Sequence, residues 1–218
     1  REALAEAVAR HDGAEERDRA LLVLERARVG LVQEAIVGVA QRAVAEALRG
    51  AGYATGYVGK WHLGIQNHHH PTQFGYDVFA GIRVGGCPPK DPLMETLDGE
   101  MKKVEGYTCD IFTDHTIDFI RKNQDRPFLA SLHFRAPHAA WLPVRPEDWE
   151  PFKDLDPEIP NPDYPNLNIE RVKKQTREYL AAVKSIDRNV GRVLELLKEL
   201  ELEDNTIIVF TSDHGYNL

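Results

Sequence analysis

Residues 127–134 read PFLASLHF, an apolar run with charged residues on both sides. A short, uninterrupted apolar run of this kind is typical of a strand that is buried on both faces of a sheet. A second such run, TIIVF, occupies residues 206–210, and a shorter β-prone run, YATGYV, occupies residues 53–58. We therefore expect three strands, of which the two apolar ones are buried.

Helical patterns lie between these strands. Apolar residues at helical spacing cover residues 110–122, and a longer amphipathic pattern covers residues 172–200. Alternating strands and helices predict an α/β fold, in which helices cover both faces of the sheet. The Gly-, His- and Pro-rich stretch that ends at Pro92 is expected to form loops, and the Pro-rich residues 137–165 an irregular surface excursion.

The first part of the chain differs in composition from the rest. Residues 1–49 are rich in Ala, Glu, Arg and Val, and the apolar residues between 32 and 48 keep helical spacing. Gly50 and Gly52 follow, where a helix would end. We therefore expect an atypical helical segment at residues 1–41 and a separate domain at residues 42–218.

Composition excludes several classes of protein. The formal net charge of −8 argues against a nucleic-acid-binding protein, which needs lysine and arginine to neutralise phosphates. No run of about 18 apolar residues is present, so we expect no membrane span. The two cysteines are too few for a disulfide scaffold and lack the paired spacing of a zinc site. An anionic substrate would need positive groups placed locally.

Two polar residues follow the first strand, within GKWHLG at residues 59–64. In an extended segment, residues two apart point the same way, so Lys60 and His62 are expected to converge on one anion. Lysine would act as a point charge and histidine as a hydrogen-bond donor or proton carrier. Taken alone, so short a motif is more often a surface lysine and a loop histidine.

Polar residues also follow the other two strands. His138 comes after the strand at 127–134, and Asp213 and His214 come after the strand at 206–210. A carboxylate at a strand end can bind a hard cation or accept a proton, although Asp213 could equally cap a helix. Because ligands collect at the carboxyl ends of parallel strands, these residues predict a site at one edge of the sheet.

Several segments resemble one enzyme family in both order and spacing. AGYATGYVGKWHLG at residues 51–64 resembles the second signature of type I sulfatases, and PTQFGYD at residues 71–77 is similar to that family's PTxxGFD segment. The resemblance covers roughly residues 44–218. The ending SDHGYNL is similar to the iduronate and choline sulfatase side of the family.

The resemblance implies a fold and a set of roles. The expected fold is an alkaline phosphatase-like sandwich, present only in part, with a mixed, mainly parallel sheet between helices. Lys60 would bind the sulfate and the nucleophile, and His62 would hydrogen-bond the formylglycine hydrate. His138 would contact the sulfate ester and its leaving oxygen. Asp213 and His214 match a pair that binds Ca²⁺ in the family.

The sequence also departs from the family. Its catalytic formylglycine derives from a Cys/Ser-x-Pro-x-Arg motif upstream of the GKWH segment, and no such motif precedes Lys60. Cys87 begins a Cys-x-Pro run, but this lies downstream and has Asp91 where arginine is needed, which favours a coincidence in a loop. Residues 1–41 occupy the place of the motif without resembling it. We expect a sulfuric ester hydrolase fragment that is inactive as given.

Two alternatives stay open. One is a phosphoester or phosphonate hydrolase of the same superfamily, and the other is a noncatalytic, degenerate product. The expected partner is a small-molecule or carbohydrate sulfate ester. The family implies a periplasmic or secreted location, and no oligomeric state follows from the sequence.

Overall fold

The computed structural model describes residues 20–26 and 44–212. In this part of the chain, one sheet contains β1 (Ala20–Arg26), β2 (Ala54–Lys60), β3 (Val78–Ile82), β4 (Leu93–Glu95), β5 (Met101–Lys103), β6 (Phe128–Phe134) and β7 (Thr206–Phe210). The helices are residues 44–50, α3 (Thr108–Asn123), α4 (Pro146–Trp149) and α5 (Ile169–Glu199), with 3-10 turns η1 (Asn67–His69), η2 (Pro71–Phe74) and η3 (Glu203–Asn205).

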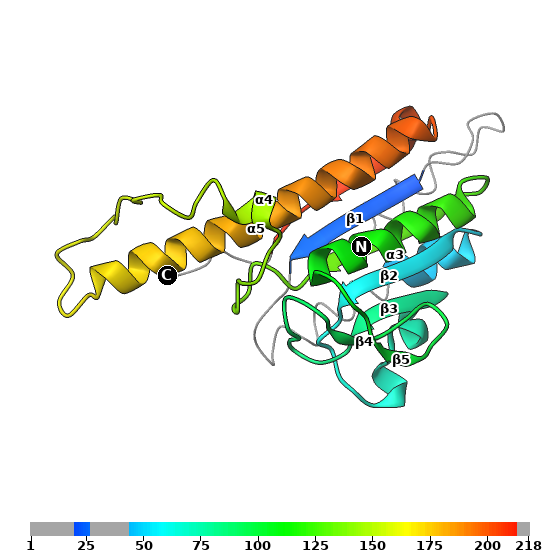
Figure 1. Cartoon of the computed structure of the whole chain (residues 1–218). Coiled ribbons are helices and arrows are strands. Elements are labelled where there is room, and N and C mark those ends of the chain that lie inside the picture. The colour runs from blue at the N-terminus through cyan, green and yellow to red at the C-terminus, as the bar shows by residue number, and fades with distance from the viewer. Residues whose placement is uncertain (1–19, 27–43, 213–218) are drawn as a thin grey trace.

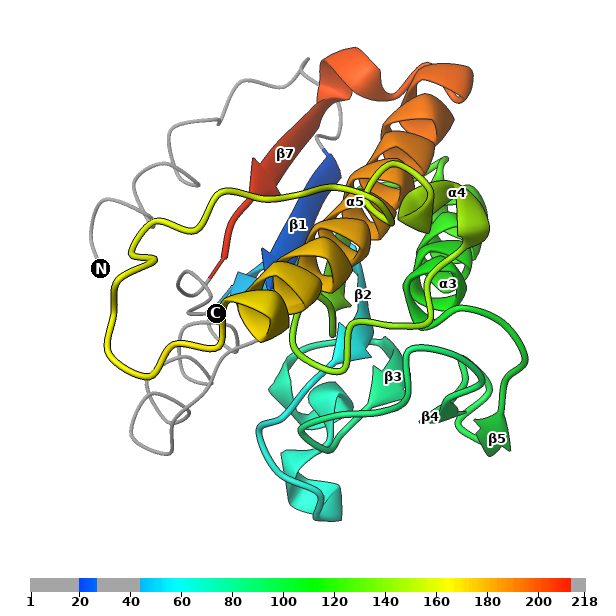
Figure 2. The ribbon, with the colours of Figure 1, turned by 60° about the vertical axis from the view of Figure 1, so that its left-hand side comes forward.

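The strand order is β5-β4-β3-β2-β6-β1-β7 (Figures 1 and 2). The strands from β3 to β7 in this order run parallel, whereas β4 and β5 are antiparallel. The predicted mixed, mainly parallel sheet is confirmed. Parallel strands end at the same edge, so every segment that leaves β2, β6 or β7 begins there.

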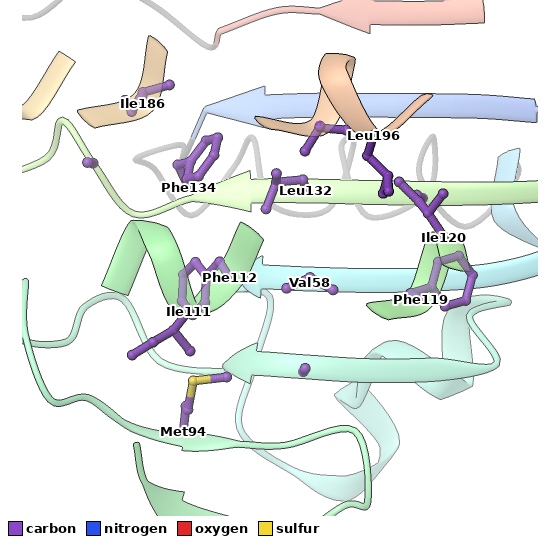
Figure 3. Packing of buried hydrophobic residues seen from close by; sticks show 14 of the residues in the cluster. Val58, Met94, Ile111, Phe112, Phe119, Ile120, Leu132, Phe134, Ile186 and Leu196 are labelled. Carbon is purple, nitrogen blue, oxygen red and sulfur yellow. The ribbon is translucent and has the colours of Figure 1, made fainter. Parts of the chain in front are cut away.

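Alternate residues of the central strands build two hydrophobic clusters, one on each face of the sheet. Val58 and Leu132 belong to the first cluster, which includes side chains from α3 and α5 and is shown in Figure 3. Both helices lie on the same face in Figure 2. Tyr57 and Leu129 belong to the second cluster, together with Ala45 from the helix at residues 44–50. Burial on both faces explains the uninterrupted apolar sequence of β6.

The prediction of a helical segment at residues 1–41 is wrong for residues 20–26, which form β1 (Figure 1). Alanine, leucine, glutamate and arginine all favour helices, so local propensity pointed the wrong way. β1 lies between β6 and β7 and pairs with both, and this tertiary pairing overrides the propensity. The other residues of the 1–41 segment lie outside the described part of the chain.

Two further strand predictions need correction. β3 lies within the stretch that was expected to form loops, because its five residues sit between glycine-rich turns. β7 is a strand as predicted, but it is not buried, since Ile208 is 40% and Phe210 67% exposed. Among the described strands β7 pairs with β1 alone, so it forms an edge of the sheet. The apolar run therefore predicted the strand without predicting what covers it.

The predicted helices at residues 110–122 and 172–200 are confirmed as α3 and α5. The first turns of α5 extend past the carboxyl edge of the sheet (Figure 1). The Pro-rich segment is irregular as predicted, apart from the single turn of α4. No helix in the described part is both long enough and apolar enough to cross a membrane.

An ion-pair network fastens the Pro-rich segment to the helices. Arg188 of α5 donates to Asp148 of α4 and to Asp110 of α3, and Arg145 also donates to Asp110. Burial opposes the charge of Asp110, but hydrogen bonds from Arg145, Asn189 and Arg188 outweigh it and hold the pKa of this carboxyl below its ordinary value. The segment that follows β6 is thus anchored at α4.

Candidate active site

The carboxyl edge of the sheet brings Lys60 and the His138 segment to the same side of the molecule. Gly59 of β2 is paired with His133 of β6, so Lys60 ends its strand beside Phe134. The segment that carries His138 leaves β6 directly after Phe134. These two predicted site residues therefore lie at one edge, as the parallel topology required.

Lys60 is fixed by its strand and by its neighbours. It is 3% exposed, its carbonyl accepts a 2.6 Å hydrogen bond from the Tyr57 hydroxyl, and it is paired with Ile82 of β3. The next residue, Trp61, donates its backbone N–H to Ile82 at 2.9 Å. Lys60 is thus a buried cation in the last position of β2, at the carboxyl edge of the sheet.

The backbone turns sharply at His62. Its φ of 55° lies in the left-handed region, so the extended geometry of β2 ends before it. The argument that Lys60 and His62 point the same way because they are two residues apart is therefore wrong. Instead, the His62 ring lies against Gly85, where an added Cβ would be 2.5 Å from the ring Nε2. The loop after β3 thus helps to place His62.

His138 is exposed, and its ring is oriented by its own loop. Its Nδ1 lies 2.7 Å from the carbonyl oxygen of Ala139. A carbonyl only accepts, so Nδ1 must carry the proton in this contact. The other ring nitrogen, Nε2, accepts a hydrogen bond when the ring is neutral and donates one when the ring is protonated.

Arg135 holds the backbone of this loop. The residue is 4% exposed, and its guanidinium donates to the carbonyls of His138 at 2.9 Å and Ala140 at 2.6 Å. Trp141 adds a third tie, because its indole N–H donates to the Pro137 carbonyl at 2.8 Å. Sequence reasoning gave Arg135 no role, although it stands three residues before His138 where the strand ends.

Cys87 lies within the electrostatic reach of two site cations. Burial raises the pKa of its thiol, while a hydrogen bond with Thr108 and the positive charges of Arg135 and Lys60 oppose that rise. Burial likewise raises the pKa of Cys109 to about 12. Both thiols are free and protonated at neutral pH, so neither is an activated nucleophile. The interpretation of Cys87 as a loop residue stands, but its loop adjoins the site.

A small cavity of about 10 Å³ lies beside Arg135 and Trp141. Its other walls come from the start of α3 and from α5, including Tyr107, Thr108 and Ser185. A volume of this size holds about one water molecule, so the cavity has no room for a substrate group. His138, which is exposed, is not among the residues that line this cavity.

The predicted metal ligands cannot be placed in this way. Asp213 and His214 lie outside the described residues. Within the described part, no group of three or more His, Cys, Asp or Glu side chains is arranged to hold a metal ion. The described residues thus supply Lys60, His62, His138 and Arg135, but not a complete set of donors for a cation.

Comparisons with known proteins identify similar sequences. A model of the family described as Sulfatase matches residues 22–218. The uncharacterized sulfatase YdeN of Escherichia coli is 29% identical over 195 residues, which cover 78% of this chain and 32% of that protein. The human N-acetylgalactosamine-6-sulfatase is 29% identical over 203 residues, covering 84% of this chain and 34% of the human protein.

Solved structures share the fold. The structure of yidJ from Bacteroides fragilis has a TM-score of 0.71 at 19% identity and covers 94% of this chain and 64% of its own. The structure of BT4656, in complex with its substrate D-glucosamine-2-N,6-O-disulfate, has a TM-score of 0.67 at 19% identity, with 90% and 65% covered. These similarities support the alkaline phosphatase-like fold.

The family match begins at residue 22, inside β1, whereas the expected domain began at residue 42. The chain spans about a third of the length of the curated relatives it matches. Since the match covers residues 22–218, which are most of the chain, the chain belongs to the sulfatase family.

Proposed function

We propose that this chain supplies part of the active site of a sulfuric ester hydrolase that acts on carbohydrate sulfates. The observation that carries the proposal is the location of Lys60 and the His138 loop at the carboxyl ends of two adjacent parallel strands, β2 and β6. A fixed ammonium and an oriented imidazole are the groups that a sulfate ester needs, because negative charge spreads over its oxygens during transfer.

Lys60 and His138 would have different roles in this reaction. The Lys60 ammonium would neutralise charge on the sulfate oxygens as a point charge. His138, with the proton on Nδ1 held by the Ala139 carbonyl, would present Nε2 to the ester, and in the doubly protonated ring Nε2 would donate its proton to the leaving oxygen. His62, placed by the loop after β3, would hydrogen-bond the hydroxyl groups of the nucleophile.

Sulfatases generally bind a metal ion. Asp213 would hold it here, because a carboxylate suits a hard cation such as Ca²⁺, and the imidazole of His214 is the weaker donor for such an ion. The ion would supply positive charge opposite the sulfate. The described residues alone do not make this site.

Carbohydrate sulfates are the proposed substrate class for two reasons. The human relative is an N-acetylgalactosamine-6-sulfatase, and the structural relative BT4656 has D-glucosamine-2-N,6-O-disulfate as its substrate. The alternative of a phosphonate ester substrate has weaker support, since a phosphonate monoester hydrolase shares the fold with a TM-score of 0.51 at 16% identity. The closeness to iduronate and choline sulfatases stays a prediction from the sequence.

The nucleophile sets a limit on activity. No Cys/Ser-x-Pro-x-Arg motif occurs in the 218 residues, and the Cys87 thiol has a raised pKa. We therefore propose that this polypeptide binds the anion at Lys60 without turning over an ester. Binding and turnover must then be measured separately.

The binding test titrates inorganic sulfate into the chain by calorimetry, with Ca²⁺ present. Lys60→Ala should weaken binding by about tenfold or more, because a buried hydrogen-bonded charge is lost. Lys102→Ala, at a 45% exposed surface lysine, is the matched control and should leave binding unchanged. Equal sulfate affinity in the wild-type chain and in Lys60→Ala would contradict the proposal that Lys60 binds the anion.

The turnover test compares an aryl sulfate with an aryl phosphonate, after coexpression with a formylglycine-generating enzyme. We expect no release from either ester by this chain. Sulfate release that disappears in Lys60→Ala would show that a nucleophile is present after all. Release from the phosphonate alone would instead favour the alternative substrate class.

A further inference from the structure

The loop that follows β6 has an unusual internal geometry around Ala139. Arg135, a buried residue, donates hydrogen bonds from its guanidinium to two backbone carbonyls, those of His138 and Ala140. These two carbonyls flank the carbonyl of Ala139 in sequence. The carbonyl between them accepts from the His138 ring instead. Three successive backbone carbonyls thus each accept a hydrogen bond from a side chain, and the first and third accept from the same side chain, Arg135.

Arg135 is a costly residue for this position. Its side chain is 4% exposed, and among the described residues its hydrogen bonds go to backbone carbonyls and not to a carboxylate. Burying a cation without an anionic partner costs free energy, and here desolvation lowers the pKa of the guanidinium. A loop that needed only packing would be served by an apolar side chain.

The planar fork explains why an arginine stands here. Two N–H groups in a fixed plane can reach two carbonyls at once, which no other side chain does as rigidly. With the carbonyls of His138 and Ala140 directed at Arg135, the Ala139 carbonyl is left to point towards the His138 ring. The position of that oxygen decides which ring nitrogen carries the proton.

We propose that Arg135 is a positioning residue that fixes the tautomer of His138, holding the proton on Nδ1 so that Nε2 faces the substrate. This inference deepens the proposed function, because it rests on His138 acting at the sulfate ester. The tautomer of His138 can also be measured in the chain without any turnover of an ester.

The test reads the tautomer directly, by long-range ¹H–¹⁵N correlation spectra of the histidine rings in the whole chain above the ring's titration range. His138→Gln identifies the His138 signals by their loss. In the wild-type chain, neutral His138 should be mainly the Nδ1–H form. In Arg135→Met, the ratio of Nδ1–H to Nε2–H should fall about fivefold, which corresponds to ~1 kcal/mol for one hydrogen bond.

Two further variants separate positioning from general stability. Arg188→Met removes another partly buried arginine, which pairs with Asp148 and Asp110 and does not touch the His138 loop. It should lower the unfolding temperature yet leave the His138 tautomer unchanged. Arg135→Lys keeps a positive charge but loses the planar fork, so it should shift the tautomer in the same direction as Arg135→Met.

Two results would overturn the proposal that Arg135 fixes the His138 tautomer. If the ratio of Nδ1–H to Nε2–H in Arg135→Met equals the ratio in the wild-type chain, Arg135 does not set the tautomer. Arg135→Lys gives the same readout should the methionine variant not fold. An equal tautomer shift in Arg188→Met would mean that loss of stability alone is the cause. Failure of sulfate binding in the wild-type chain would sink the proposed function while leaving the tautomer result intact.

Discussion

β6 and β7 are both short apolar strands of the same parallel sheet, yet they have opposite surroundings. All seven residues of β6 are buried, between β2 and β1 and beneath α3. Of the strands that the structure describes, β7 pairs with β1 alone, and four of its five residues are exposed. Their sequences differ little in character. The burial of a strand in this sheet therefore depends on neighbouring elements that lie far away in sequence. As a result, the contribution of an apolar side chain to the free energy of unfolding depends on the place of its strand in the strand order.

The largest contrast should come from truncating one side chain in each strand. Leu132→Ala in β6 removes a fully buried side chain and should lower the free energy of unfolding by about 2–5 kcal/mol. Ile207→Ala in β7, at a 51% exposed side chain, should cost less than about 1 kcal/mol. Urea unfolding measures both. Equal losses would mean that β7 is covered in solution.

The buried histidine of β6, His133, should make the free energy of unfolding depend on pH. Burial lowers the pKa of His133 to about 3, below its unfolded value of about 6.5. The unfolded chain therefore binds the proton first, and stability should fall as pH drops below about 6.5, by roughly 3 kcal/mol at pH 4.

His133→Phe is the variant for this prediction. It retains an aromatic ring stacked on Tyr57, whose centroid lies 4.1 Å from that of His133, but it has no proton to bind. The free energy of unfolding, followed from pH 7 to pH 4, should then lose most of this slope. An unchanged slope would assign the acid sensitivity to other groups, such as the Asp110 network.

A smaller effect should follow from crowding the contact between β2 and β6. Gly59 has a φ of 123°, and a Cβ added there would lie 1.9 Å from the His133 carbonyl oxygen. Gly59→Ala should therefore cost about 1–3 kcal/mol in urea unfolding, through backbone strain and a forced separation of the strands. Gly99→Ala is a useful control for strain alone, because its φ is also positive but nothing lies within 4 Å.

The smallest effect is expected at the end of β7. Phe210 is 67% exposed, so Phe210→Ser should change the free energy of unfolding by less than about 0.5 kcal/mol. The same replacement at Phe128 of β6, which is 1% exposed, should cost several times more. Thermal unfolding of the two variants side by side provides the measurement. A large loss at Phe210 would contradict the exposure of β7.

The sequence carried the parts of the fold that local pattern encodes. Helical spacing and apolar runs predicted α3, α5 and β6, because each buries a face that the pattern itself marks. β1 was missed since its residues favour helices and its strand form depends on β6 and β7. β3 was missed because a short strand among glycine-rich turns carries little pattern of its own.

The candidate site shows the same division. Lys60, His62 and His138 were predicted from their positions after strands and from resemblance, and the structure places Lys60 and the His138 loop at one edge. Arg135 was not predicted, because its role depends on where the carbonyls of the next few residues turn. The roles of Asp213 and His214 stay predictions, since both lie outside the described residues.

The place of β1 in the strand order also bears on how the chain assembles. Residues 20–24 pair with residues 206–210, which lie 186 positions further along the chain. Such a pairing forms only after a very long loop has closed, and contacts of this kind slow folding more than they affect final stability. During synthesis the segment that becomes β1 must wait for β6 and then for β7. The side of the sheet that contains β1 and β7 is thus completed late, although β1 precedes both of its partners in the chain.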